Sequence, residues 1–155
     1  MRTTVFSGAR IVDPSRGLDE IGTVVVADGR IAAAGASALN QGTPEGATVV
    51  DCAGKTIIPG LVDGRVFVGE PGAEHRETLA SASLAAAAGG VTSFVMMPDT
   101  DPVIDDIALV EFVLRTARDT ACVNVHPAAA ITRNLDGREM TEFGLLREAG
   151  AVAFT

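Results

Sequence analysis

The stretch PGLVDGRVFVGEPG, residues 59–72, decides the fold expected for this chain. Its centre, LVDGRVFV, is a short and almost continuous apolar run, which is typical of a strand buried in a parallel sheet. Helical patterns and further short apolar runs then alternate along the chain. In order, the sequence predicts a helix over 77–88, a strand over 92–97, a helix over 105–119, a strand over 121–126, a helix over 139–149 and a strand over 150–154. This alternation predicts an α/β fold with a parallel sheet and right-handed crossovers.

Local signals set the limits of these elements. Asp105 is expected to cap the second helix, whose buried face would carry Ile107, Val110, Val113 and Leu114. Pro127 is expected to end the third strand, because proline cannot donate a hydrogen bond to a neighbouring strand.

The first 56 residues read differently, as short strands joined by turns. GTVVVADGRIAAAG predicts a hairpin with Asp28-Gly29 at its turn, because Asp-Gly between apolar runs favours a tight reversal. ATVVDCAGKTIIPG predicts one more strand pair, turning at Ala53-Gly54. We therefore expect two domains, a small β-module over 1–56 and βα units over 57–155.

Three and a half βα units cannot close an eight-stranded barrel, which needs about 250 residues. The final strand also has no helix after it to cover it. We expect these 155 residues to be part of a longer fold.

Composition narrows the classes of function. The formal net charge is −8, which argues against nucleic acid and against an anionic membrane surface as partners. No secretory leader and no long apolar segment is present in the sequence, which predicts a cytoplasmic protein. Lys55 is the only lysine, so a Schiff-base or carboxylated bridging lysine has one candidate.

Five stretches resemble the amidohydrolase superfamily, and within it dihydroorotase more than hydantoinase. They are GARIVDPSRGLDE, VVADGRIAAAG, KTIIPGLVDGRVFVGEPGAEHRET, AAAAGGVTSFVMMPDTDPVID and LREAGAVAFT. The resemblance implies that residues 57–155 form the first part of a (β/α)8 barrel of the TIM type. It also implies that residues 1–56 form half of a small β-sandwich module.

The resemblance also implies a zinc site, which this sequence lacks. In the family the first barrel strand ends with Asp-x-His-x-His, and a metal-bound hydroxide attacks the cyclic amide. Here Asp63 matches the Asp, but Arg65 and Phe67 stand at the two histidine positions. Arginine stays protonated and phenylalanine has no ligand atom, so neither can bind a cation. We expect no metal ligand, no catalytic residue and no cofactor among these residues.

Two positions that hold the substrate in the family also differ. Gly69 replaces an arginine that clamps the substrate carboxylate, and Asp99 replaces an asparagine that contacts it. A vestigial pocket is therefore expected from Asp63, Arg65, Phe67, Gly69 and Asp99.

Several side chains allow two interpretations. The Arg65 guanidinium could replace the metal charge by pairing with Asp63, Glu70 or Asp99, or it could reach solvent. We expect Phe67 to fill the volume that the metal vacates, because protein interiors tolerate few voids.

Both histidines and an acidic run have simpler explanations than metal binding. His126 is placed at the carboxyl end of the third strand but has no second histidine nearby, and His75 is expected on the surface. Asp99, Asp101, Asp105 and Asp106 are interpreted as loop and cap residues rather than a hard-metal site.

Three functions stay open. The resemblance favours a noncatalytic dihydroorotase homologue of pyrimidine biosynthesis, oligomeric and assembled with aspartate carbamoyltransferase. The second is an active zinc-dependent cyclic amidohydrolase with ligands from beyond residue 155. The third is a non-enzymatic barrel that binds a small molecule, with Arg65 as an anion anchor.

Overall fold

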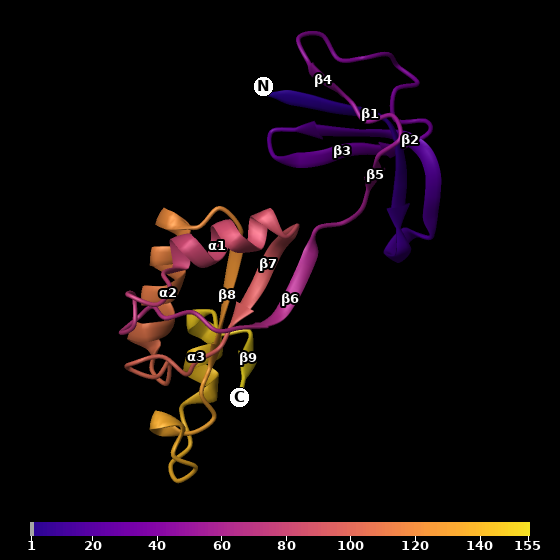
Figure 1. Cartoon of the computed structure of the whole chain (residues 1–155). Coiled ribbons are helices and arrows are strands. Elements are labelled where there is room, and N and C mark those ends of the chain that lie inside the picture. The colour runs from indigo at the N-terminus through magenta and orange to yellow at the C-terminus, as the bar shows by residue number, and fades with distance from the viewer. Residues whose placement is uncertain (1) are drawn as a thin grey trace. The chain divides into compact units, whose positions relative to one another are not determined.

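The computed structural model describes residues 2–155 and divides into two compact units. The first unit ends at Pro59 and the second begins at Gly60. Figure 1 shows strands alone in the first unit and alternating strands and helices in the second. No helix among the described residues is long and apolar enough to cross a bilayer.

The first unit is a single sheet of five strands in the order β3-β2-β1-β4, with β5 also paired to β1. The strands are β1 (Thr3–Asp13), β2 (Leu18–Ala27), β3 (Arg30–Gly35), β4 (Thr48–Asp51) and β5 (Thr56–Ile57). A short 3-10 helix, η1 (Pro14–Arg16), joins β1 to β2.

The predicted hairpin is confirmed. β2 and β3 are antiparallel, and both turn residues have positive φ, 49° at Asp28 and 76° at Gly29. Two successive residues with positive φ match the twist of the flanking strands, which is why Asp-Gly is favoured there.

The strand pair predicted around Ala53-Gly54 is wrong. β4 and β5 both run parallel to β1, with Thr4 opposite Thr48 and Arg10 opposite Thr56. The turn at Gly54 does not reverse the chain. Extra residues at this turn lie outside the strand pairing, and the chain then pairs with β1 again in the same direction.

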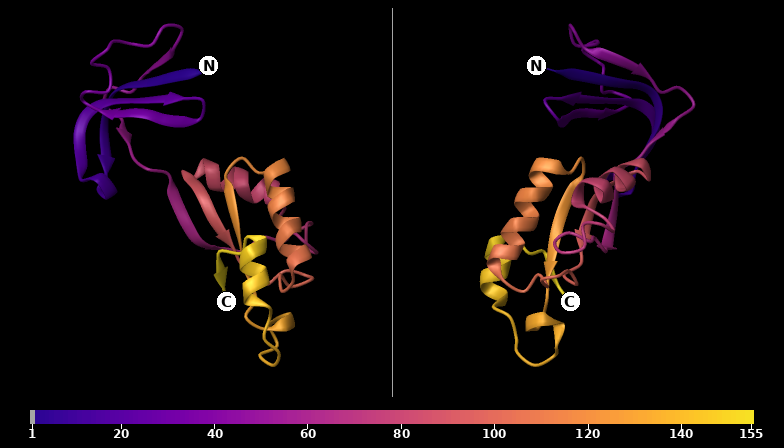
Figure 2. Two further views of the ribbon diagram at one scale, coloured as in Figure 1. Left: turned by 180° about the vertical axis from the view of Figure 1, so that it is seen from behind. Right: turned by 60° about the vertical axis from the view of Figure 1, so that its left-hand side comes forward.

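The second unit is a parallel sheet in the order β6-β7-β8-β9, which confirms the predicted α/β alternation. Its strands are β6 (Leu61–Val66), β7 (Val91–Met96), β8 (Asn124–Ala129) and β9 (Ala153–Phe154). Its helices are α1 (Leu79–Ala88), α2 (Ile107–Thr120) and α3 (Phe143–Ala149), with a 3-10 helix η2 (Arg133–Leu135) before α3. The three helices cover one face of the sheet (Figure 2).

The helix starts differ from the predicted ones because of their caps. Thr78 forms a reciprocal capping box with Ser81, so α1 begins after Thr78. Asp106, not Asp105, caps α2, and its carboxylate accepts the amide N–H of Leu109 at 3.0 Å. Ile107, expected on the buried face of α2, is 38% exposed because it opens the helix.

The third strand and the third helix also begin later than predicted. Pro127 lies inside β8, opposite Met96, and its carbonyl accepts the amide N–H of Val152 at 3.0 Å. Residues before α3 form a bridge between Thr132 and Met140 in place of helix. The bridge uses backbone groups that a helix from 139 would need.

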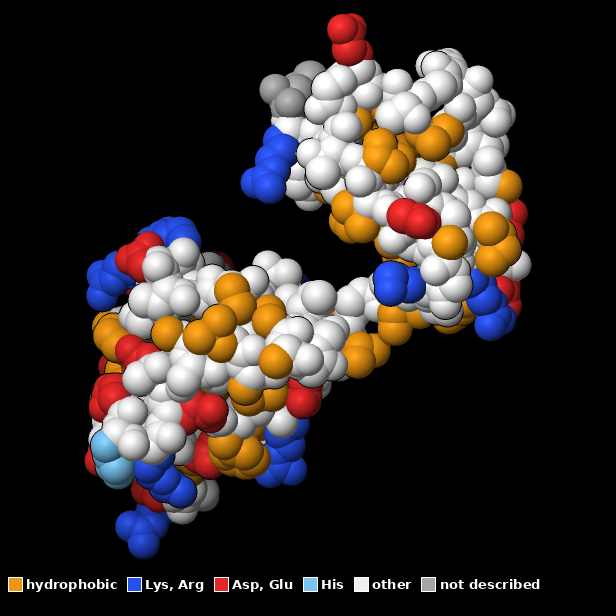
Figure 3. Space-filling view, turned by 45° about the horizontal axis from the view of Figure 1, so that its top comes forward, with side chains coloured by type: hydrophobic (Ala, Val, Ile, Leu, Met, Phe, Trp, Pro, Cys, Tyr) orange, Lys and Arg blue, Asp and Glu red, His pale blue; other side chains and the backbone are white. Residues whose placement is uncertain are grey.

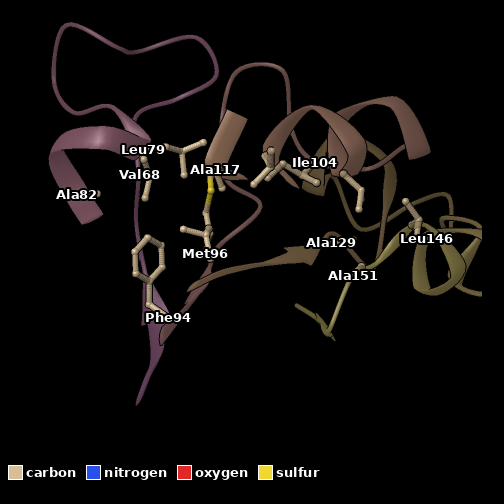
Figure 4. Packing of buried hydrophobic residues seen from close by; sticks show 13 residues of the cluster. Val68, Leu79, Ala82, Phe94, Met96, Ile104, Ala117, Ala129, Leu146 and Ala151 are labelled. Carbon is tan, nitrogen blue, oxygen red and sulfur yellow. The ribbon is translucent and has the colours of Figure 1, made fainter. Parts of the chain in front are cut away.

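One hydrophobic cluster lies between the sheet and the helices (Figure 4). Phe94 and Met96 of β7 are fully buried there, against Leu79 of α1 and Val110 of α2. Apolar side chains also remain exposed on the strands, including Val62 at 70%. Figure 3 shows exposed hydrophobic side chains on both units.

Candidate functional site

Strand β6 and the residues after it divide their side chains between two faces. Val66 and Val68 pack with the hydrophobic cluster, so the alternate residues Arg65 and Phe67 point to the other face of the sheet. Asp63 pairs with Phe94 within β6, but the register is irregular between Asp63 and Val66, so the alternation does not extend back to Asp63. Period-2 geometry therefore brings two of the predicted positions, Arg65 and Phe67, onto one side.

Arg65 and Phe67 contact each other rather than an acidic partner. The guanidinium carbon of Arg65 lies 5.3 Å from the centroid of the Phe67 ring, a cation–π contact. Among residues 2–155 no carboxylate forms an ion pair with Arg65, although Asp63 accepts its backbone N–H at 3.0 Å. The Arg65 side chain is exposed in the described structure, which agrees with the interpretation that it reaches solvent and not with the one in which it pairs with a carboxylate. Phe67 is 53% exposed, so it fills no enclosed volume among these residues.

Two cavities meet at Phe67 and Asp99. The larger has a volume of about 590 Å³ and is lined also by Gly69, Arg76 and Asp101. The smaller, of about 150 Å³, is lined also by Arg65 and Leu135. Four of the five residues of the expected vestigial pocket therefore line these cavities, and Asp63 lines neither.

The backbone at Gly69 leaves no room for a side chain. A Cβ built there would overlap the carbonyl oxygen of Ala73 and lie 2.8 Å from that of Glu77. The turn is tight because the Ala73 amide donates to the Gly69 carbonyl at 2.6 Å. An arginine at this position would require the loop to move.

Three acidic residues near these cavities have structural partners. Asp106 caps α2, and Asp105 accepts the backbone N–H of Asn134 at 2.8 Å. Glu70, considered above as a partner of Arg65, accepts the amide N–H of Leu79 at 2.8 Å, at the start of α1. Residues 2–155 contain no group of three or more His, Cys, Asp or Glu side chains placed to hold a metal ion.

The histidines lie away from these cavities. His126 is opposite Val95 in the middle of β8 and is exposed, so its predicted place at the carboxyl end of the strand is wrong. The reason is that β8 begins and ends three residues later than the predicted 121–126. His75 is exposed in the turn before α1, as expected.

Leu135 is a cavity residue that the sequence did not reveal. It has φ of 57°, a left-handed conformation that leucine rarely adopts, and it follows Asn134 at 53°. Asn134 was the only local signal for such a turn, because asparagine tolerates this conformation.

A model of the dihydro-orotase-like family matches residues 54–155. The chain belongs to this family. It is 42% identical over 97% of its length to a dihydroorotase of Syntrophus aciditrophicus, and 44% identical over 97% to one of Pelotomaculum thermopropionicum. These matches span 35% and 34% of those proteins, so the chain has about a third of their length.

The fold of the family agrees with a solved structure. The L-hydantoinase (dihydropyrimidinase) of Arthrobacter aurescens superposes with a TM-score of 0.82 and 26% identity, over 99% of this chain and 32% of that one. The similarity of this chain to dihydroorotase, predicted from its sequence motifs, is therefore confirmed.

The metal implied for this family does not fit the residues found here. The two positions that would carry imidazoles, one in β6 and one just after it, carry a guanidinium and a phenyl ring, and neither has a lone pair for a cation. The Arg65 charge would also repel a dication at short range.

Proposed function

We propose that this chain is part of a dihydroorotase-like protein of de novo pyrimidine biosynthesis that does no zinc chemistry. Its role would be structural, as a partner of aspartate carbamoyltransferase in an oligomer. The parallel sheet would be the first part of a (β/α)8 barrel, and the first unit would be part of a β-sandwich.

The contact between Arg65 and Phe67 carries the proposal. Both side chains, from β6 and the segment just after it, project to one face, at the positions where the family resemblance places two metal-binding histidines. The guanidinium repels a dication by its charge, and neither the guanidinium nor the phenyl ring has an atom that can ligate a metal ion.

The substrate positions support the same conclusion independently. Gly69 has no space for the carboxylate-clamping arginine, and Asp99 would bring a negative charge toward an anionic substrate. A rebuilt metal site would not require the loss of these contacts as well.

The first test measures zinc per chain and dihydroorotate hydrolysis on the full chain, purified without chelator. We expect zinc far below one per chain and no turnover above the uncatalysed rate. Stoichiometric zinc with turnover would instead support the alternative function, an active amidohydrolase. The 41–44% sequence identity to dihydroorotases is the observation that favours this alternative.

A matched variant sharpens this test. Arg65→His combined with Phe67→His restores both imidazoles at the spacing of the family. We expect this variant to bind more zinc than the natural chain, whereas Arg138→His with Met140→His, two exposed positions of the loop before α3, should not.

The proposed partnership has its own test. Aspartate carbamoyltransferase and the full chain would be mixed and separated by size-exclusion chromatography with light scattering. A stable complex of defined mass is expected. Elution of the two proteins at their separate masses at micromolar concentrations would contradict the structural role.

A further inference from the structure

The smaller cavity combines two opposite charges with an apolar lining. Arg65 and Asp99 both line it, together with the apolar residues Phe67, Met97, Pro98 and Leu135 and the polar Thr155. Its volume of about 150 Å³ is below the ~300–1,000 Å³ of pockets for drug-sized ligands, so it suits a small molecule. All these residues belong to the second unit.

The two charges do not neutralise each other. Among residues 2–155 neither Arg65 nor Asp99 takes part in an ion pair, and neither side chain forms a hydrogen bond. The guanidinium therefore keeps its N–H groups for a carboxylate, and the Asp99 carboxylate keeps its oxygens for a cationic donor.

The apolar part of the lining is held in place by an uncommon backbone conformation. Asp105 accepts the Asn134 amide N–H at 2.8 Å, and both Asn134 and Leu135 have positive φ. Leu135, in this conformation, lines the cavity together with Phe67, the residue that follows β6. Residues in sparsely populated conformations cluster at ligand sites.

We propose that this cavity binds a small apolar α-amino acid as a zwitterion. The ligand carboxylate would meet Arg65, its ammonium group would meet Asp99, and its side chain would lie against Phe67 and Leu135. A ligand with no net charge also avoids repulsion from a chain whose formal net charge is −8. The inference rests on the proposed function in one respect, the absence of a metal ion between Arg65 and Asp99.

L-Leucine is the probe, with three analogues that each remove one feature. 4-Methylpentanoate lacks the ammonium group, leucine methyl ester lacks the carboxylate, and glycine lacks the apolar side chain. Calorimetric titration of the full chain should give measurable leucine binding, with each analogue at least about tenfold weaker. A lost charge-assisted hydrogen bond accounts for roughly that factor in the two analogues that lack a charge, and lost apolar burial accounts for it in glycine.

Variants locate the binding in the cavity. Arg65→Gln and Asp99→Asn should each weaken leucine binding about tenfold or more, whereas Arg138→Gln removes an exposed charge outside the cavity and should change nothing. Circular dichroism of each variant checks that the fold is retained.

The inference is overturned if leucine does not bind at millimolar concentration, or if 4-methylpentanoate or the ester binds as tightly as leucine. Zinc content is measured on the same preparations. If the protein contains no zinc and does not bind leucine, only the proposal of leucine binding is overturned. If the protein contains zinc and turns over dihydroorotate, the proposed function is overturned.

Discussion

The guanidinium carbon of Arg65 lies 5.3 Å from the centroid of the Phe67 ring, and both side chains point away from the hydrophobic cluster. Two residues apart on one strand, they share a face because successive side chains alternate. A cation–π contact at an exposed site contributes about 0.5–1 kcal/mol, so this pair adds little to the stability of the unit. Its importance lies in the chemistry that it excludes.

Phe67, which follows β6, and Phe94 of the neighbouring strand β7 should respond very differently to truncation. Phe67 is 53% exposed and Phe94 is fully buried. We expect Phe67→Ala to lower the free energy of unfolding by about 1 kcal/mol or less, and Phe94→Ala by about 3–5 kcal/mol, because the second leaves a cavity. Urea unfolding of the full chain measures both. Equal losses would mean that Phe67 is buried by residues outside this structure.

Gly69 should not tolerate even one added carbon. Its Cβ would overlap the Ala73 carbonyl, whereas a Cβ at Gly64 would meet nothing within 4 Å. We expect Gly69→Ala to destabilise by about 1–3 kcal/mol, as overpacking does. Gly64→Ala is the matched control and should be neutral or slightly stabilising. A neutral Gly69→Ala would show that the loop has room to move, and an arginine could then be restored there.

The caps of α2 allow a test of the two neighbouring aspartates. Asp106→Ala removes the acceptor for the Leu109 amide and should lower the free energy of unfolding by about 1 kcal/mol. Asp106→Asn keeps an acceptor and should lower it by less. Asp105→Ala should instead speed hydrogen exchange at the Asn134 amide, which Asp105 accepts. The reverse result would mean that Asp105 caps the helix, as the sequence suggested.

The first unit should lose stability in acid through Asp19. The hydrogen bonds from Arg10 and its positive charge hold the pKa of Asp19 below its ordinary value, and both bonds are 2.7 Å long. A lowered folded-state pKa means that the contribution is complete above the unfolded pKa, about 4. It is lost as pH falls from there through the folded pKa.

Asp19→Asn should therefore reduce the acid dependence of unfolding below about pH 4. Thermal unfolding from pH 2 to 7 at low salt measures this, and added salt should reduce the effect because the pair is exposed. Asp28→Asn is the control, since the Asp28 carboxylate accepts the backbone N–H of Arg2 and forms no ion pair within residues 2–155. An unchanged acid limb in Asp19→Asn would contradict the role assigned to the pair.

Sequence patterns determined the order of the elements and the face on which the site residues lie. Alternating apolar runs and helical patterns specified the parallel α/β unit, and Asp28-Gly29 specified the hairpin of the first unit, because these signals are local in the chain. Neither Arg65 nor Phe67 has a side-chain atom that can ligate a metal ion, and this too is a property of the residues themselves.

The tertiary structure decided the points that depend on partners distant in the chain. β4 and β5 both pair with β1 in parallel and not with each other, and Pro127 lies within β8, where its carbonyl accepts the amide N–H of Val152. The cavity joining Arg65, Asp99 and Leu135 draws on three separate segments, namely β6, the loop after β7 and the 3-10 helix η2. No local pattern reports such a meeting, since side chains far apart in sequence come together only when the sheet sets the positions of its strand ends.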